Sequence, residues 1–381
     1  MNQICSRKRL LNCLLCSTFI LSLFLIFTFE SCKSPTSPTS NILPDTTSNN
    51  YEWQTFILGD GNSSMLNDVT IINDSLAYAV GGIYLKDSTG QNYQLDYNIA
   101  KWDGRSWQLK RVAYNIYNYN CTVAGNFFGM STAIFSFDPN NQFLTDGEDI
   151  IDWNETSYSH YPCIDPFIKG ALLRIWGANK EKFYVVGRGG TLIYYTNENG
   201  YYTNEQGKSI DLGTSTDIFS VWGTTDAKTG ETTAYVPVSD LINVNGIKKI
   251  FKLNGTQVDS IQWNTGKNVL SVWGTPDGST MYAAGDGLFE NKGNGWEEIP
   301  FDTNTRFFEI RGDKSNNIFA RGIRLVPPLD EVVAHYNGSS WHEYPELSGF
   351  YYYGIAVKGK TVIIVGENGN QAVALIGRRI D

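Results

Sequence analysis

Four segments of the chain share one pattern, Leu172-Leu-Arg-Ile-Trp-Gly177, Ile218-Phe-Ser-Val-Trp-Gly223, Val269-Leu-Ser-Val-Trp-Gly274 and the diverged Phe307-Phe-Glu-Ile-Arg-Gly312. Each segment is short and apolar and ends in glycine, which is typical of a β-strand that runs into a turn. A polar turn and a second apolar segment follow, and the second segment also ends in glycine. The second segments include Leu76-Ala-Tyr-Ala-Val-Gly81, Phe183-Tyr-Val-Val-Gly187, Met281-Tyr-Ala-Ala-Gly285, Ile318-Phe-Ala-Arg-Gly322 and Val362-Ile-Ile-Val-Gly366.

A third strand, a turn and an aromatic residue complete several of these units, as in Lys101-Trp-Asp-Gly-Arg-Ser-Trp107 and His335-Tyr-Asn-Gly-Ser-Ser-Trp341. Asp-Gly and Asn-Gly tolerate a positive φ and favour tight hairpins. The second-strand glycines recur on average about every 48 residues, close to the ~40–50 residues of a propeller blade. We therefore predict an all-β, seven-bladed β-propeller, with six or eight blades as alternatives. The blades are predicted to begin near Met65, Asn115, Gly170, Thr216, Lys267, Arg306 and Phe350.

The last predicted blade is too short for four strands, whereas an extra strand precedes the first blade. This extra strand is Tyr51-Glu-Trp-Gln-Thr-Phe-Ile57, and its Trp53 matches the aromatic residue of an outer strand. We expect this N-terminal strand to complete the seventh blade, because a closed ring leaves no exposed sheet edge.

The repeats cover residues 51–381 and resemble bacterial seven-bladed propellers of the Trp-Gly/Asp-Gly-x-x-Trp type. More broadly, they are similar to kelch and galactose-oxidase-like propellers. The resemblance implies a rigid ring whose loops carry the function, and it supplies no catalytic motif for this chain.

Residues 1–31 are typical of a secretory signal, with Arg7, Lys8 and Arg9 before an apolar stretch. The end of this segment resembles a bacterial lipobox, with the small residue Ser31 before Cys32. The resemblance implies that Cys32 is the lipidated first residue of the mature chain. Residues 32–50 are rich in Ser, Thr and Pro, which favours an extended tether.

The predicted location is the cell envelope, with the chain held on a membrane by its lipid. No acidic residue stands directly after Cys32, which favours the outer membrane over the inner one. One alternative is an uncleaved anchor, because the 20 residues from Leu10 to Phe29 would just span a bilayer. Simple secretion is the other alternative. Outside the signal and Cys32, the cysteines are Cys121 and Cys163, which either form a disulfide in an oxidising envelope or remain two buried thiols.

Composition excludes several classes of function. The net charge is −9, which argues against a nucleic-acid partner. The chain has only 3 histidines and no zinc spacing, phosphate loop or Gly-x-Ser-x-Gly elbow, so we predict no metal, no cofactor and no catalytic residue. We interpret the tryptophans of the Trp-Gly pairs as packing between blades. We expect no sialidase-like arginine cluster, because the candidate arginines lie at different strand positions: Arg174, Arg306, Arg311 and Arg321.

The predicted binding face is the end of the ring where the loops between second and third strands meet the loops between blades. Its candidate ligand residues are Arg188, Asp286, Arg324 and Glu367. We expect a monomeric, non-catalytic propeller that presents this face to an envelope protein or glycan. The alternative is an envelope polysaccharide hydrolase or lyase with its site in the central channel. Three or more converging carboxylates, or a carboxylate beside an arginine cluster, at the channel opening would argue against the non-catalytic scaffold and favour the enzyme.

Overall fold

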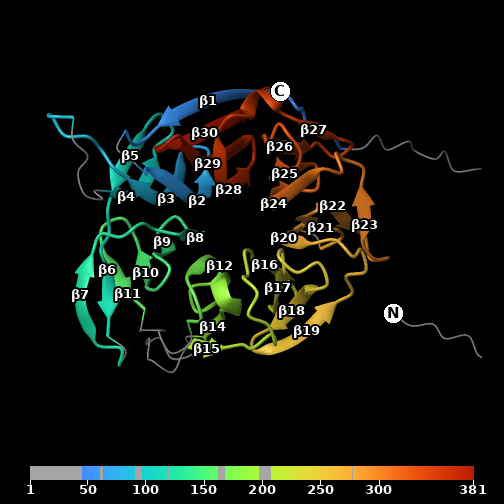
Figure 1. Ribbon diagram of the computed structural model, residues 1–381, viewed down its shortest axis with the longest axis horizontal. Coiled ribbons are helices and arrows are strands. Elements are labelled where there is room, and N and C mark those ends of the chain that lie inside the picture. The colour runs from blue at the N-terminus through green and yellow to red at the C-terminus, as the bar shows by residue number, and fades with distance from the viewer. Residues whose placement is uncertain are drawn as a thin grey trace, which may run out of the picture. The chain divides into compact units, whose positions relative to one another are not determined.

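The computed structural model describes residues 45–381, except for 61–62, 91–96, 119, 162–167, 197–206 and 277. Within these residues, seven antiparallel sheets of four strands each surround a common axis (Figure 1). The predicted all-β fold with seven propeller blades is therefore confirmed. No helix of the described residues is long and apolar enough to cross a membrane, and the predicted signal and Cys32 lie outside them.

In each of the first four blades, the strands pair in the order of the chain, from the inner strand to the outer one. Blade one contains β2 (Met65–Asn73), β3 (Leu76–Ile83), β4 (Tyr97–Trp102) and β5 (Trp107–Lys110). Blade two contains β8 (Ala133–Asp138), β9 (Asn141–Thr145), β10 (Ile150–Trp153) and β11 (Tyr158–His160). Blade three contains β12 (Leu172–Asn179), β13 (Lys182–Gly187), β14 (Leu192–Thr196) and β15 (Gly207–Ser209). Blade four contains β16 (Trp222–Thr225), β17 (Thr232–Ser239), β18 (Lys248–Asn254) and β19 (Gln257–Ile261).

The remaining blades bring the C-terminal part of the chain back to the first blade. Blade five contains β20 (Val269–Gly274), β21 (Met281–Gly285), β22 (Gly287–Asn291) and β23 (Glu297–Ile299). Blade six contains β24 (Thr305–Lys314), β25 (Asn317–Arg324), β26 (Glu331–Tyr336) and β27 (Trp341–Glu343). Blade seven contains β28 (Tyr351–Lys358), β29 (Thr361–Asn368), β30 (Gln371–Arg379) and β1 (Tyr51–Ile57).

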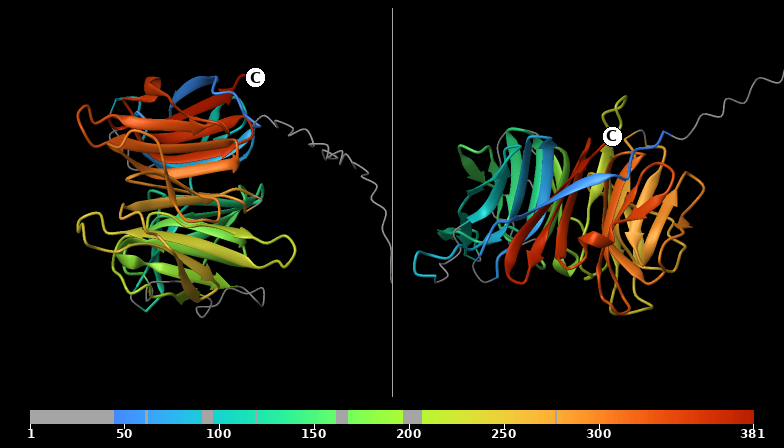
Figure 2. Two further views of the ribbon diagram at one scale, coloured as in Figure 1. Left: turned by 90° about the vertical axis from the view of Figure 1, so that its right-hand side faces the viewer. Right: turned by 90° about the horizontal axis from the view of Figure 1, so that it is seen from above.

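The N-terminal strand closes the ring, as the sequence predicts. β1 pairs with β30 in one continuous register, from Tyr51 opposite Arg379 to Ile57 opposite Val373. Both views of Figure 2 show the blue β1 beside the red strands of the C-terminal blade. The outer edge of blade seven is thereby covered by a strand from the other end of the chain.

The predicted start of blade two near Asn115 is wrong. Asn115 lies in β6 (Tyr114–Tyr117), which pairs with β7 (Val123–Phe127) in a separate hairpin between blades one and two. Blade two begins only at Ala133. The inserted hairpin lengthens the interval between Gly81 and Gly147 beyond the average of about 48 residues.

The hydrophobic core lies between neighbouring blades. In the described part of the chain there are seven clusters of buried apolar residues, and each joins two adjacent blades. The cluster containing Leu66 and Ile363, for example, joins blade one to blade seven. Because a four-stranded sheet cannot bury both faces alone, this arrangement makes each blade depend on its neighbours.

Candidate functional site

The inner strands of five blades contain a bulge near their start. At this point the glycine that ends the second strand approaches the inner backbone closely. An added Cβ on Gly366 would lie 1.8 Å from the Tyr351 carbonyl oxygen, and one on Gly285 would lie 1.9 Å from that of Asn268. The glycines that end the second strands therefore leave room for the bulge. The bulge changes the direction of the side chains of the second and third residues of the inner-strand motif.

These motif residues surround a cavity of about 340 Å³ at the end of the ring where the inner strands begin. We call it the upper cavity, and this end the upper face. Phe219, Phe308 and Tyr351 are 38%, 36% and 57% exposed and stand at its opening. The second motif residues form much of its apolar wall: Leu173, Phe219, Leu270, Phe308 and Tyr353.

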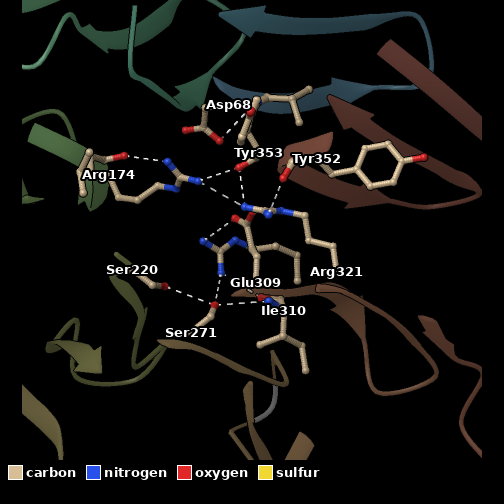
Figure 3. Close-up of polar contacts among 12 residues, drawn as sticks. Asp68, Arg174, Ser220, Ser271, Glu309, Ile310, Arg321, Tyr352 and Tyr353 are labelled. Atoms are coloured by element: carbon tan, nitrogen blue, oxygen red, sulfur yellow. Dashed lines mark hydrogen bonds and ion pairs between the residues drawn. The ribbon is translucent and has the colours of Figure 1, made fainter. Parts of the chain in front are cut away.

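A layer of charged side chains forms the floor of the upper cavity (Figure 3). At its centre is Glu309, whose side chain is only 4% exposed. Arg321 Nε donates to Glu309 Oε2 at 3.1 Å, and Arg311 Nη2 lies 3.0 Å from Glu309 Oε1. Burial opposes ionisation of Glu309, but the surrounding guanidinium groups outweigh it and hold its pKa below the ordinary value.

Arg174 and Asp68 complete this charged layer, defined as Asp68, Arg174, Glu309, Arg311 and Arg321. Arg174 Nη2 lies 3.9 Å from Glu309 Oε2 and donates to the Tyr353 carbonyl oxygen at 3.1 Å. Asp68 accepts hydrogen bonds from the backbone N–H groups of Val69 and Ile134. Burial raises the pKa of Asp68, and the nearby Arg174 only partly opposes this rise.

The charged layer separates the upper cavity from a second, lower cavity of about 260 Å³. Arg174, Glu309 and Arg311 line both cavities and so form the partition between them. The tryptophans of the Trp-Gly pairs line the lower cavity and also pack between blades. Trp176 lies over Gly223 of the next blade, where an added Cβ would be only 2.4 Å from the indole ring. This contact agrees with the interpretation of these rings as packing residues.

Glu331, at the start of β26, also lines the upper cavity. Burial raises its pKa to about 7, against the opposing effects of Arg321 and the Tyr352 backbone N–H. Its Oε2 atom is buried and has no hydrogen-bond partner among the described residues. Glu331 is therefore a largely buried carboxyl group at the wall of the cavity, and its surroundings disfavour its ionised form.

The four predicted ligand residues have different surroundings. Arg188 lines the upper cavity. Asp286 Oδ1 accepts from Arg306 Nε at 2.6 Å, whereas Arg324 pairs with Asp302 and Glu343. Glu367 accepts a hydrogen bond from the Tyr353 hydroxyl at 3.0 Å. The structure thus brings Arg188 to the cavity and engages the other three in local pairs, and their role in ligand binding stays a prediction.

Cys121 is disulfide-bonded in the turn between β6 and β7. Cys163 and the lipidation candidate Cys32 lie outside the described residues, so the pairing of Cys121 with Cys163 and the lipid anchor stay predictions. Among the described residues, no group of three or more His, Cys, Asp and Glu side chains is placed to hold a metal ion.

The expectation that the arginines form no cluster is wrong for Arg174, Arg311 and Arg321, although Arg306 does lie apart with Asp286. One feature of the sequence could have predicted the charged layer. The third motif residue is polar or charged in an otherwise apolar strand: Asp68, Arg174, Ser220, Ser271 and Glu309.

No family model matches this chain, and no curated protein matches it significantly. Two solved structures illustrate the likeness of its fold. YCF48 from Cyanidioschyzon merolae is 14% identical with a TM-score of 0.55, over 86% of this chain and 98% of that one. The WD40 β-propeller domain of Doa1 is 12% identical with a TM-score of 0.54, over 88% of this chain and 99% of that one. At these identities the likeness shows the propeller fold alone.

Proposed function

We propose that this protein is a membrane-tethered propeller that binds an envelope protein or glycan through its upper face, without catalysing a reaction on it. The observation that supports this function is the upper cavity, which opens between exposed aromatic residues on a rigid ring. Aromatic side chains around a depression are typical of binding surfaces, because they offer a large contact area at a small cost in conformational entropy.

The charged layer places Glu309 beside three arginines, which is the arrangement expected to argue against a non-catalytic scaffold. In this respect the charged layer favours the enzyme alternative. It does not supply a free catalytic carboxylate, because Glu309 is buried and surrounded by guanidinium groups that favour its ionised form.

The upper face can be tested with a photo-crosslinking residue at position 308 and a matched one at position 180. Position 308 lies at the opening of the upper cavity, whereas Lys180 lies in the turn between β12 and β13 at the opposite end of the inner strands. We expect a crosslinked envelope partner from position 308 only. Equal crosslinking from both positions would contradict binding through the upper face.

The tether has its own test, radiolabelled palmitate incorporation into the full chain and into Cys32→Ala. We expect the label in the wild type and none in the variant, because the lipid is predicted on the Cys32 thiol. Label that persists in Cys32→Ala would refute lipidation at this position and would favour another mode of attachment.

A second candidate function is an envelope polysaccharide hydrolase or lyase, and Glu331 is the observation that favours it. A carboxyl with a pKa of about 7 beside Arg321 has the protonation behaviour of a general acid or base. Incubation with acidic polysaccharides, followed by size analysis of the products, tests this candidate. Cleavage by the wild type that is lost in Glu331→Gln would favour the enzyme over the binding protein.

A further inference from the structure

The upper cavity carries an excess of positive charge in an acidic protein. Four arginines and two glutamates line it, whereas the whole chain has a net charge of −9. A concave site lined by one sign of charge raises the local concentration of oppositely charged ligands. The cationic residues are Arg174, Arg188, Arg311 and Arg321, and the anionic ones are Glu309 and Glu331.

Arg188 supplies charge that no group of the described residues neutralises. It is exposed, and no described residue forms a hydrogen bond or ion pair with its guanidinium group. Its backbone is held firmly, because its N–H donates to the Ala171 carbonyl oxygen at 2.8 Å and its carbonyl accepts from Thr191 Oγ1 at 2.8 Å. A fixed backbone with a free guanidinium group at a cavity opening is suited to bind an anion.

The unpartnered oxygen of Glu331 is a second, independent sign of a missing ligand group. Buried polar atoms in proteins nearly always have a partner, from the protein, from water or from a ligand. Because the pKa of Glu331 is about 7, a large share of its carboxyl groups carries a proton at neutral pH. A protonated carboxyl group can donate a hydrogen bond to an anion. Glu331 and Arg188 both line the upper cavity and both have unused hydrogen-bonding capacity.

The apolar walls and the volume of the cavity limit the chemistry and the size of the uncharged part of the ligand. Its walls include the apolar side chains of Phe219, Leu241, Leu270 and Phe308, and its floor is closed by the charged layer. A volume of about 340 Å³ lies in the range of small-molecule sites. Inside the cavity, these apolar walls disfavour a small ligand covered with hydroxyl groups, because its hydrogen bonds to water would be lost on entry.

We infer that the upper cavity binds a small amphipathic carboxylate, an organic acid whose carboxylate meets Arg188 and whose aromatic or branched aliphatic body packs against Phe219 and Phe308. This site goes beyond the proposed function, because it concerns a small molecule inside the ring and not a macromolecule on its face. The charge and the apolar surface of such an acid each match a different part of the lining.

Calorimetric titration of the full chain in detergent tests the inference, with 3-phenylpropanoate as the probe and 3-phenylpropanamide as its neutral control. We expect the acid to bind at least tenfold more tightly than the amide. Arg188→Gln is expected to weaken binding of the acid at least tenfold and to leave binding of the amide unchanged. Arg105→Gln removes the same charge from an exposed turn outside the cavity and is expected to change neither affinity.

The inference would be overturned by equal affinity for acid and amide, by equal effects of Arg188→Gln and Arg105→Gln, or by tighter binding of glucuronate or inorganic phosphate than of 3-phenylpropanoate. A peptide that ends in a free phenylalanine carboxylate is the last probe. If this peptide binds and 3-phenylpropanoate does not, the occupant is a chain end and the small-molecule assignment fails. Crosslinking from position 308 without acid binding would refute this inference alone and leave the proposed function standing.

Discussion

Blades five and six have the same inner-strand motif, the same bulge and the same glycine at the end of the second strand. They differ at three equivalent positions, two on the inner strand and one on the second strand, which we call the axial positions. In both blades, the third motif residue pairs across the sheet with the residue immediately before that glycine, Ser271 with Ala284 and Glu309 with Arg321. Blade six thus has Glu309, Arg311 and Arg321 where blade five has Ser271, Trp273 and Ala284.

The difference shows that one backbone can support either packing or a charged site. In blade five, Trp273 is buried and lies over Gly312 of blade six. In blade six, Arg311 and Arg321 converge on Glu309. The glycine and apolar positions that both blades share determine the fold, whereas the axial positions that differ determine what the channel can bind.

The largest expected effect is that of Glu309→Ala, which removes the carboxylate from among three largely buried guanidinium groups. Breaking a buried ion pair in this way costs about 3–5 kcal/mol of stability, because the remaining charges lose their partner. Chemical denaturation measures the loss. The matched change in blade five, Ser271→Ala, is expected to cost about 1 kcal/mol. Equal losses in the two blades would show that the charged layer has no special role.

The double variant Glu309→Ser with Arg321→Ala gives blade six the blade-five residues at these two positions. We expect it to be less destabilised than Glu309→Ala, because one charge of each sign leaves the layer together. Denaturation of the two single variants and the double variant yields the coupling energy. Strictly additive losses would contradict a direct interaction between Glu309 and Arg321.

A pH-dependent effect is expected from Glu331, a blade-six residue beside this layer. Its pKa rises from 4.5 when unfolded to about 7 when folded, so the folded state holds the proton more tightly. The associated stability is present below pH 4.5 and is lost as the pH rises through 7. We expect Glu331→Gln to reduce the loss of stability between pH 5 and pH 8 by about 2–3 kcal/mol. Unfolding curves at both pH values measure this, and identical pH dependence in the two proteins would contradict it.

The smallest effect is expected where blades five and six meet at their rim, in the pair Asp286–Arg306. Both side chains are partly exposed, and such pairs contribute under about 1 kcal/mol. Asp286→Asn is therefore expected to lower the thermal midpoint only slightly at low salt and not at all in about 1 M salt, where the charges are screened. A large loss that persists at high salt would indicate a structural role beyond the ion pair.

The repeats made most of the fold predictable, because apolar strands, turn glycines and blade length are local properties of the sequence. The start of blade two was missed because the hairpin of β6 and β7 has the alternating strand pattern of a blade without its glycine-ended motif. The average repeat length places a blade where the chain instead inserts a separate pair of strands.

The charged layer was harder to predict, because its members come from three blades and from different strands. Arg174 and Glu309 occupy the same motif position, but Arg321 reaches them from a second strand. Arg188 was predicted at the binding face from its place after a second-strand glycine, and the structure places it at the upper cavity. The other predicted residues have the same kind of sequence position but meet local partners, as Asp286 meets Arg306.

The sequence by itself determined the all-β class, the seven blades and the closing strand, because periodic apolar segments and glycines restrict the backbone directly. Only the tertiary structure decided which charges meet. Curving the chain into a ring brings Arg174 of blade three to the carboxylate of Glu309 in blade six, which lies 135 residues later in the chain. Such a meeting depends on ring closure and bulge geometry, which no local pattern of residues specifies.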